Sequence, residues 1–564
     1  MRNIIIVECF STGKNYIKDI IDRNYNPVVL EVKSYDDSTE SKRYQKEVKE
    51  CYESIDEDFE LIHEKDTYEE TLKIVKEYDP LLVIPGSEKG VIMATKLSND
   101  LGLLGNPIEN LDAMTLKDKM HERLAENNLR HIRGKTIESV EDAIDFYDSA
   151  GLKKVVVKPV YSAGSVGVRL CDDKNEMINA INEVFSVKGI YGNDIDKILI
   201  QEMIEGEEYI VNTASCNGIH RVTSIYKYKK QKTSEGGMIY DYDEVIVELN
   251  MGETELVEYA YDVADAIGIK YGPVHGEYMI DENGPVLIEV NCRPRGGNID
   301  AEYLNMIFGH HETDCSLDSY LNPKKFHYDR NKGYRTYAYG FIKEFIVPKD
   351  LIVKSAPIRK IGVNLKSHYK TLINLGNESH LLTKTQDLET SGGSVFLVNK
   401  DYRQIKKDLE FLRKIERRAF DMVLSEEKNM KMDIDENKIN HNIKRLLKNV
   451  KIFGTVLLIT EKKSDELNVH QVTYDEIDQI TGEFDCIIVN LNESLYNESA
   501  ENVTRVLLTI CDKVKVGGLI FIPNTTYESV PDGRLGMEAL MKVLDFNLEI
   551  PMHKLTRMII ASKE

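Results

Sequence analysis

The sequence lacks any long apolar run. Its longest apolar stretches, such as Leu81–Pro85 and Val456–Ile459, are far shorter than the roughly 20 residues that a membrane-spanning helix needs. The first residues also lack the small-residue cleavage pattern of a signal peptide. We therefore expect no membrane segment, no signal peptide and a cytoplasmic location.

Paired cysteines and histidine metal motifs are missing as well. The eight Cys residues include no CxxC pair, and the 13 His residues include no HExxH motif. This usage is typical of a reducing compartment and excludes a disulfide framework. It also argues against a structural zinc site or another transition-metal site.

Positive charge is scarce. Lys and Arg total 73 against 95 Asp and Glu, which gives a net charge of −22. Such a chain cannot hold a nucleic-acid backbone by bulk electrostatics, so we expect no nucleic-acid partner, and any anionic ligand needs a local binding device. The 564 residues, 42% of them hydrophobic, suffice for three or four domains at roughly 100–200 residues each.

Strands and helices alternate over the first hundred or so residues. Asn3–Val7, 27–30 and Leu81–Pro85 have strand character, with helical stretches between them. This rhythm predicts βαβ units and a parallel sheet. Because ligands of such sheets bind where strands end, Glu88 is a candidate substrate residue, although an ordinary turn with a capping Ser fits the same pattern.

The pattern then changes to longer helices and antiparallel strands. Thr115–Asn127 is helical, 334–397 indicates further strands with turns, and Tyr402–Glu426 is one long amphipathic helix. Residues 427–440 are polar and form a plausible linker, after which the βαβ rhythm returns over 441–564. The fold class is therefore multidomain, with both α/β and α+β parts.

A strand of β-branched residues carries a lysine near its end, and a loop of small residues follows the strand. Lys158 follows Val155–Val157, and the loop Ser162–Gly167 begins four residues after it. Gly and Ser let backbone N–H groups approach an anion closely, and Lys adds a point charge. The segment is not a Walker sequence, and taken alone it also fits a plain hairpin.

Acidic residues surround an apolar hinge further along. The hinge Glu202-Met203-Ile204 can offer backbone groups to an adenine edge, and Glu208 can accept hydrogen bonds from ribose hydroxyls. Taken alone, these residues are better explained as solvated acids around a turn.

Two apolar strands with embedded acids carry the clearest signal. The segments 275–280 and 286–290 are joined by Asp281-Glu282-Asn283-Gly284, and Asn-Gly between alternating apolar runs predicts a hairpin. The hairpin brings Glu277 close to Glu289.

Asn291 lies on the same face as Glu289, because the two are separated by two residues on one strand. Two carboxylates and an amide oxygen suit Mg²⁺ that carries nucleotide phosphates. Arg293 adds a cation beside them. A purely structural role would leave two acids in apolar strands without a partner, which is costly.

In this order the elements resemble the ATP-grasp superfamily over about 115–297, and 1–112 is similar to the domain that precedes it in that family. The resemblance implies that Lys119 and Lys158 approach the nucleotide phosphates, while Glu202 and Ile204 hold the adenine. It also implies that Glu208 binds the ribose. The metal ligands would be Glu277, Glu289 and Asn291, and Arg293 would lie near the transferred phosphate. The loop residues implied are Ser162, Ala163, Gly164, Ser165 and Gly167.

The resemblance also implies a domain arrangement. An ATP-grasp domain would cover 113–426, with a lid over about 130–200 and a C-terminal subdomain over about 325–426. Within the superfamily, the amino-acid sequences of segments 272–277 and 284–297 are most similar to those of the L-amino-acid ligase branch. Arg295 departs from that pattern, and a second cation there would favour a substrate with an additional anionic group, unless Arg295 simply packs against a surface acid.

The implied activity is an ATP-dependent carboxylate–amine ligase. ATP and Mg²⁺ (or Mn²⁺) would be its cofactors, and a small-molecule carboxylate and an amine its substrates. The carboxylate would form an acyl phosphate, and the amine would then displace phosphate. Arg293, Lys158 and His275 are the candidate catalytic residues, His275 by orienting an acid or donating to the acyl phosphate, although a single His at a strand start is often structural.

Other functions fit the same residues. The acceptor can instead be bicarbonate or the carboxylate of a peptide, and a nucleotide-binding regulatory protein would use the site without catalysis. The intact metal set argues against the regulatory alternative. The sequence leaves the oligomeric state open, with a homodimer as one expectation.

The segment 441–564 is similar to the second half of a class I methyltransferase fold. Its strand Val456–Ile459 runs into Thr460-Glu461-Lys462, where such enzymes need a Gly-rich turn against the cofactor. We therefore expect a Rossmann-like domain without catalytic activity, and an active methyltransferase is the alternative.

Overall fold

The computed structural model describes residues 1–33, 38–161, 167–186, 195–233, 238–352, 365–373, 381–388, 390–424, 455–460, 463, 469–489, 510, 513–523, 546–550 and 558–563. It divides into two compact units. The first contains Met1–Ile342, Gln386–Glu389 and Val398–Tyr402, and the second contains Lys343–Thr385, Thr390–Leu397 and Arg403–Glu564. Among the residues described, no helix is both long and apolar enough to cross a membrane.

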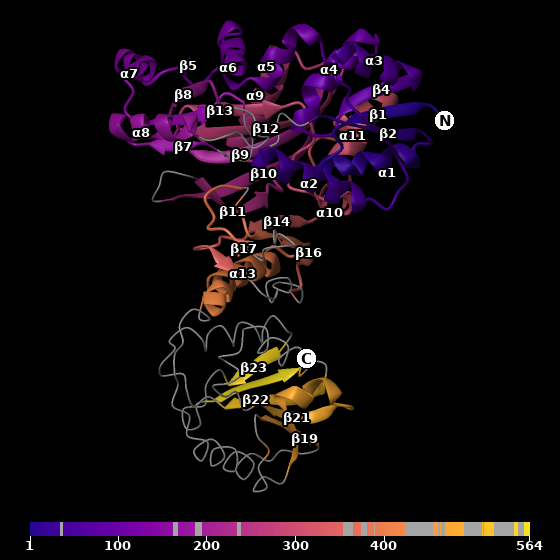
Figure 1. The fold of residues 1–564 in the computed structure, drawn as a ribbon, viewed down its shortest axis with the longest axis vertical. Helices are drawn as coiled ribbons and strands as arrows, with labels where there is room; N and C mark the ends of the chain where they lie inside the picture. Colours follow the sequence, from indigo (N-terminus) through magenta and orange to yellow (C-terminus); the bar gives the residue numbers. More distant parts are fainter. Residues whose placement is uncertain are drawn as a thin grey trace. The chain divides into compact units, whose positions relative to one another are not determined.

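The first unit begins with a parallel sheet in the order β3-β2-β1-β4 (Figure 1). This confirms the parallel βαβ arrangement predicted from the alternating strands and helices. Because the strand order reverses between β1 and β4, the loops after these two strands border the crevice where such sheets bind ligands. The elements are β1 (Asn3–Val7), α1 (Asn15–Asp22), β2 (Asn26–Glu31), α2 (Thr39–Glu53), β3 (Glu60–His63), α3 (Tyr68–Glu77), β4 (Pro80–Pro85) and α4 (Val91–Asp100), with 3-10 turns at Ser11–Lys14 and Glu88–Gly90.

A small antiparallel sheet, in the order β5-β8-β6-β7, covers most of the region predicted to be the lid. The apolar faces of α7 and α8 pack against it, around Ile181, Ile198 and Ile200. Its elements are β5 (Gly134–Ile137), α7 (Val140–Ser149), β6 (Val155–Pro159), β7 (Arg169–Cys171), α8 (Lys174–Phe185) and β8 (Ile198–Glu202), and it follows α5 (Leu111–Thr115) and α6 (Lys117–Glu126).

A larger sheet with the strand order β13-β12-β9-β10-β11 forms the centre of the first unit. Residues alternate between its two faces, so Val211 and Val274 pack into the core beneath α6 and α9, while Asn212 and His275 face the other way. The elements are β9 (Glu207–Cys216), β10 (Ile219–Lys232), β11 (Met238–Val245), α9 (Met251–Ile267), β12 (Tyr271–Asp281) and β13 (Gly284–Asn291).

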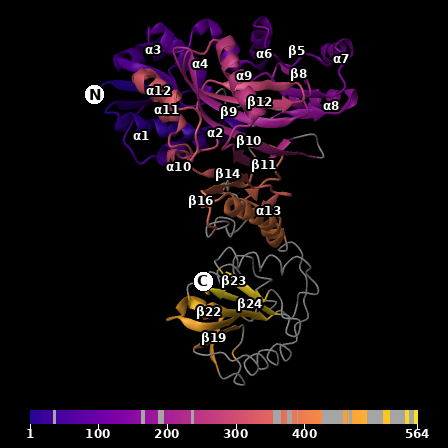
Figure 2. The same cartoon turned by 180° about the vertical axis from the view of Figure 1, so that it is seen from behind.

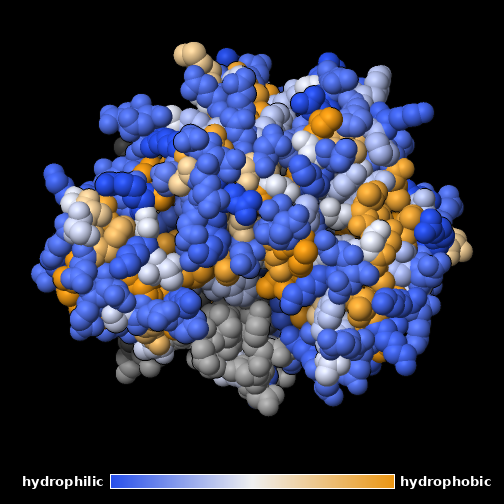
Figure 3. Space-filling view, turned by 90° about the horizontal axis from the view of Figure 1, so that it is seen from above, coloured by the Kyte–Doolittle hydropathy of each residue, from blue (hydrophilic) through white to orange (hydrophobic). Residues whose placement is uncertain are grey.

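Three helices follow the central sheet: α10 (Ala301–Phe308), α11 (Glu312–Leu321) and α12 (Pro323–Arg330). Helix α11 packs against β9 and β12 and also against α1 of the N-terminal sheet, and Figure 2 shows it from behind. Seen from above, the first unit presents mostly hydrophilic residues, with apolar residues in small separate groups (Figure 3).

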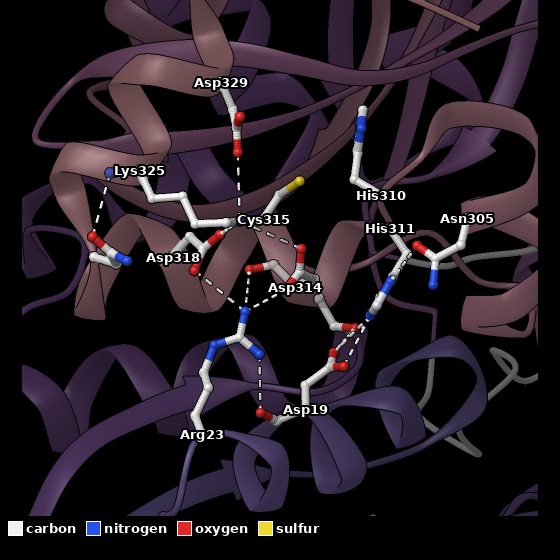
Figure 4. A network of polar contacts seen from close by, with 12 residues as sticks. Asp19, Arg23, Asn305, His310, His311, Asp314, Cys315, Asp318, Lys325 and Asp329 are labelled. Carbon is white, nitrogen blue, oxygen red and sulfur yellow. Dashed lines mark hydrogen bonds and ion pairs between the residues drawn. The ribbon is translucent and has the colours of Figure 1, made fainter. Parts of the chain in front are cut away.

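Polar contacts fix α11 to α1 (Figure 4). Asp19 accepts a hydrogen bond from Thr313 (2.6 Å), and both its carboxylate oxygens lie 2.9 Å from His311 Nε2. On the next turn Arg23 pairs with Asp314 and lies 3.3 Å from Asp318. These contacts hold both neighbours of Glu312 in place.

The His311–Asp19 contact should make stability depend on pH. Burial lowers the pKa of His311, but hydrogen bonding to Asp19 and the Asp19 charge outweigh burial and leave the pKa above its usual value. A raised pKa contributes stability that is present in full at low pH and lost as the pH rises through the folded-state pKa. We therefore expect His311→Gln to lower the melting temperature more at pH 5.5 than at pH 8.5. An equal loss at both pH values would contradict this.

In the second unit, β16 (His368–Ile373) pairs with β18 (Gly393–Asn399), β15 (Leu351–Ile352) pairs with β17 (Leu381–Leu382), and α13 spans Tyr402–Leu424. The strand β14 (Tyr339–Glu344) runs from the first unit into the second. The long helix predicted for Tyr402–Glu426 is thus present, and strands occur in the region predicted to contain them. The predicted linker at 427–440 lies outside the described residues.

A further sheet of the second unit has the order β20-β19-β21-β22-β24-β23. Strands β20, β19, β21 and β22 are parallel, while β24 runs antiparallel to both of its neighbours. The similarity to methyltransferases and the predicted domain boundaries stay predictions. The strands are β19 (Val456–Thr460), β20 (His470–Thr473), β21 (Phe484–Val489), β22 (Val514–Pro523), β23 (Phe546–Ile550) and β24 (Met558–Lys563).

Candidate active site

The β12–β13 hairpin brings the predicted metal ligands together. Its strands pair in a register that places Glu277 opposite Glu289 and His275 opposite Asn291. The turn consists of Glu282 and Asn283, and Gly284 follows with a φ of 95°, which favours glycine. Glu277, Glu289 and Asn291 therefore lie close together, as predicted from the Asn-Gly turn, and His275 lies beside them.

The Asn291 amide contacts two acids. Its nitrogen is best placed toward Glu88, donating to Oε1 (2.8 Å) and Oε2 (2.9 Å). The amide oxygen then takes the position 3.3 Å from Glu289 Oε1. Two oxygens that face each other without a proton between them form the kind of pair that a hard cation satisfies.

Two buried lysines balance the carboxylates. Lys117 Nζ lies 2.8 Å from Glu289 Oε2, with both side chains largely buried. Lys158, on β6, interacts electrostatically with Glu289 and Glu277, and burial lowers its pKa to about 8 despite these acids. Burial alone would raise the pKa of Glu289, but Lys117 and Lys158 keep it below its usual value. Glu289 is therefore ionised at neutral pH.

Lys117 was missed by the sequence analysis, which selected Lys119 instead. Lys119 Nζ pairs with Glu122 (2.6 Å), and its side chain is 43% exposed. The structure therefore does not bring Lys119 to the carboxylates, and its predicted phosphate contact stays a prediction. Helical spacing could have found Lys117, because it shares one buried face of α6 with Met120 and Leu124, at i+3 and i+7.

Glu88 reaches this site from the N-terminal sheet, as its place after β4 predicted. Its Oε2 accepts a hydrogen bond from Arg293 Nε at 2.9 Å, and both side chains are 11% exposed. Burial raises the pKa of Glu88, Arg293 lowers it, and the nearby charge of Glu289 raises it again. The structure shows that Arg293 and Glu88 form an ion pair. The predicted substrate role of Glu88 stays a prediction.

The predicted nucleotide side of the site is partly described. Glu202, at the end of β8, accepts hydrogen bonds from the Arg133 side chain (2.8 Å) and backbone (3.1 Å). The Met203 backbone N–H donates to the Lys154 carbonyl (3.1 Å), which fixes the hinge that continues into Ile204. The assignment of this hinge to adenine stays a prediction.

Glu208 is paired within the protein. Lys230 Nζ lies 2.6 Å from Glu208 Oε1, and 4.6 Å and 4.1 Å from the ring centres of Tyr228 and Tyr240. A ribose at Glu208 would share its carboxylate with Lys230. Of the predicted phosphate loop, Gly167 is described, with a φ of 74° that favours glycine. The other loop residues, Ser162, Ala163, Gly164 and Ser165, lie outside the described residues.

His275 faces the acids from the middle of β12. Its Nε2 lies 3.5 Å from Glu277 Oε1, and Tyr228 donates to the same oxygen at 3.3 Å. Burial lowers the pKa of His275 to about 4, although Glu277 raises it. The imidazole is therefore neutral at physiological pH.

Arg295 is buried rather than packed at the surface. Its guanidinium pairs with Asp243 of β11 and lies over the ring of Tyr226, 4.3 Å from the ring centre. Asp243 thus already balances the positive charge of Arg295 that an anionic substrate would need. The predicted contact between Arg295 and a substrate stays a prediction. Asp243 was not identified from the sequence, because no local pattern links β11 to residue 295.

The Arg295–Asp243 pair gives a stability prediction. Asp243→Asn removes the partner of a buried cation, so we expect the free energy of unfolding to fall by about 3–5 kcal/mol. Asp172→Asn is a matched control, because Asp172 pairs with Lys232 and Lys154 in exposed contacts that should each be worth less than about 1 kcal/mol. Urea unfolding followed by circular dichroism measures both. Equal losses for the two variants would contradict the buried-pair description.

Residues 152–302 match the family model described as the ATP-grasp domain. The match covers β6 through β13, including the hairpin that carries the acids. This chain contains an ATP-grasp domain. The resemblance inferred from the sequence is therefore confirmed, and ATP and Mg²⁺ are the cofactors of this domain type.

Known proteins have similar sequences. Dapdiamide A synthase of Enterobacter agglomerans is 26% identical over 381 residues, which cover 66% of this chain and 87% of that protein. The carbamoyl phosphate synthase large chain of Clostridium botulinum (strain Loch Maree / Type A3) is 26% identical over 249 residues, or 43% of this chain and 23% of that protein.

Solved structures show the ATP-grasp fold as well. L-amino acid ligase from Bacillus licheniformis has a TM-score of 0.56 at 16% identity, covering 73% of this chain and 97% of that one. The ADP complex of an N5-carboxyaminoimidazole ribonucleotide synthetase has a TM-score of 0.53 at 12% identity, covering 73% and 96%. At these identities the likeness concerns the fold.

The residues of the ATP-grasp domain fit Mg²⁺. Glu277, Glu289 and Asn291 offer oxygen atoms only, which is the ligand type that Mg²⁺ prefers. Within the described part of the chain, no group of three or more His, Cys, Asp and Glu side chains could hold a metal by itself. A site with two acids and one amide leaves coordination positions for phosphate oxygens and water, which is how Mg²⁺ binds with nucleotides.

Proposed function

We propose that this protein is an ADP-forming carboxylate–amine ligase that joins a small-molecule carboxylate to an amine through an acyl phosphate. One observation carries the proposal: cations and oxygen ligands from three separate parts of the chain meet at the β12–β13 hairpin. Lys117 and Glu88 come from the N-terminal side, Lys158 from the lid sheet, and Glu277 and Glu289 from the central sheet.

Each group has a role that follows from its charge and place. Glu277, Glu289 and Asn291 would hold Mg²⁺, which when bound neutralises phosphate charge. Lys158 and Arg293 offset the charge that develops on the transferred phosphate. Such sites act mainly by positioning and electrostatic stabilisation rather than by proton transfer.

The reaction has two balanced steps. A substrate carboxylate oxygen attacks the γ-phosphorus of ATP, the bond to the β-phosphate oxygen breaks, and ADP leaves. The amine nitrogen then attacks the acyl carbon, the acyl–oxygen bond breaks, and phosphate leaves while the nitrogen loses a proton. The names of dapdiamide A synthase and L-amino acid ligase support a ligase that makes an amide bond.

ADP release with a panel of carboxylates and amines, followed by product mass, tests this proposal. We expect ADP release to require both a carboxylate and an amine, and the product to have the mass of their amide. ADP release with bicarbonate alone, or with a peptide carboxylate in place of a free acid, would favour the alternative acceptors. ATP binding without ADP release for any acceptor would favour a regulatory role.

The proposal extends to partners and location. Small molecules rather than nucleic acids are the expected partners, in line with the net charge of −22. We propose the cytoplasm as the location, since all seven cysteines in the described residues are free. We also propose a homodimer, and analytical ultracentrifugation, which measures the mass of the assembly, would test it.

A further inference from the structure

A chain of buried hydrogen bonds, which runs from His275 through Asn212 to Glu312, has no role in the reaction proposed above. We call it the polar chain. His275 Nδ1 lies 2.8 Å from Asn212 Oδ1 on the neighbouring strand β9. The Asn212 amide nitrogen in turn donates to Glu312 Oε1 (2.7 Å) and Ser224 Oγ (2.8 Å). Asn212 is 1% exposed and Glu312 is 3% exposed, so water does not compete for these contacts.

Glu312 determines which way the Asn212 amide points. Its Oε2 accepts the Arg295 backbone N–H (2.8 Å), and its Oε1 accepts the Ser224 hydroxyl (3.2 Å) as well as Asn212. The Arg295 N–H and the Ser224 hydroxyl donate to Glu312 whichever way the Asn212 amide points, and an ionised carboxylate can only accept. Turning the Asn212 amide would place its oxygen against this carboxylate, which is unfavourable, so the amide oxygen must face His275.

The fold fixes Glu312 itself. Glu312 is the first residue of α11, and both of its neighbours contact Asp19 of α1: His311 through its ring (Figure 4) and Thr313 through its hydroxyl. The polar chain therefore begins at the junction between two parts of the first unit. It ends at the candidate active site.

The orientation of Asn212 fixes the tautomer of His275. An amide oxygen can only accept, so Nδ1 must carry a proton, and in this tautomer Nε2 keeps a lone pair. That lone pair faces Glu277 Oε1, another acceptor, at 3.5 Å. Two acceptors side by side favour a ligand that donates hydrogen bonds.

We propose that Asn212 and Glu312 are positioning residues that hold His275 with its proton on Nδ1, so that Nε2 accepts a hydrogen bond from the amine substrate. This inference rests on the proposed ligase function. The contact would turn the nitrogen lone pair of the amine toward the acyl carbon. It assigns His275 the role of acceptor, whereas the sequence analysis had it orient an acid or donate to the acyl phosphate.

Nitrogen-15 NMR of the full-length protein, labelled at histidine, tests the tautomer directly. A ring nitrogen without a proton resonates well downfield of a protonated one, and His275→Gln identifies the signals among the 13 histidines. We expect His275 to show a protonated Nδ1 and a bare Nε2 at neutral pH, without nucleotide or metal. A bare Nδ1, or two protonated nitrogens, would overturn the proposal.

Asn212→Leu removes the acceptor at nearly constant volume. We expect the His275 proton to move to Nε2, where Glu277 can accept it, and KM for the amine to rise about tenfold while KM for ATP stays the same. Ser224→Ala is the matched control, because Ser224 contacts Asn212 and Glu312 but not His275, so the tautomer should not change. If Asn212→Leu does not fold, Glu312→Asp serves instead, since the shorter acid should give a mixture of tautomers.

The outcomes separate this inference from the proposed function. An unchanged tautomer in both Asn212→Leu and Glu312→Asp would overturn the positioning roles even if amide formation is found. The expected tautomer together with an unchanged KM for the amine would overturn the substrate contact. If no amine supports ADP release while the tautomer behaves as expected, the ligase proposal fails and the polar chain stands.

Discussion

Glu289→Gln should lower kcat by about two to three orders of magnitude in a protein that still folds but is less stable, because Lys117 loses a buried carboxylate contact. The substitution is nearly isosteric, but it replaces a charged ligand by a neutral amide and removes the partner of Lys117. Interactions that act on developing charge in a buried site are typically worth about 10²–10³ in rate. Initial rates of ADP release, with folding checked by circular dichroism, measure the effect.

The control for this variant is an acid of the same domain that lies away from the site. Glu255 is exposed on α9, so Glu255→Gln should leave turnover unchanged. A shift of the Mg²⁺ concentration needed for half-maximal rate in Glu289→Gln, but not in Glu255→Gln, would tie the loss to the metal. Near-normal ADP release by Glu289→Gln would contradict the assignment of Glu289 as a Mg²⁺ ligand.

Arg293→Ala should lower both turnover and stability. The change removes a cation beside the predicted phosphate site, for which we expect a loss of about 10²–10³ in kcat. It also leaves Glu88 buried without its partner, and breaking such a pair costs about 3–5 kcal/mol of the free energy of unfolding. The two effects are measured separately, by ADP release and by urea unfolding.

The double variant Glu88→Gln/Arg293→Ala separates the two roles of Arg293. Removing the Glu88 charge along with its partner should restore part of the lost stability, because no unpaired charge is left buried. Turnover should stay low, because the cation is still absent. Recovery of turnover along with stability would show that Arg293 acts only through the fold.

Local patterns in the sequence predicted the parts of the site that lie on one hairpin. Alternation and the Asn-Gly turn placed Glu277 opposite Glu289, and the two-residue period placed Asn291 beside Glu289. The rule that ligands bind at strand ends selected Glu88, and in the structure Glu88 forms an ion pair with Arg293. Each of these inferences needed only neighbouring residues.

The parts that the sequence could not predict depend on contacts between distant residues. Asn212 and Glu312 are 100 residues apart, and Arg295 is 52 residues from its partner Asp243. Neither segment carries a pattern that points to the other, because tertiary packing creates the pairs. Lys117 differs from these, because helical spacing alone could have placed it on the buried face of α6 with Met120 and Leu124.

Oxygen transfer tests the central claim most directly. Once the panel has identified a carboxylate and an amine that react, the carboxylate is supplied with both oxygens as ¹⁸O, and the released phosphate and nucleotide are analysed by mass spectrometry. An acyl phosphate requires that one ¹⁸O atom appears in the inorganic phosphate and none in the ADP. Phosphate without ¹⁸O, or ¹⁸O in AMP, would contradict the proposed reaction.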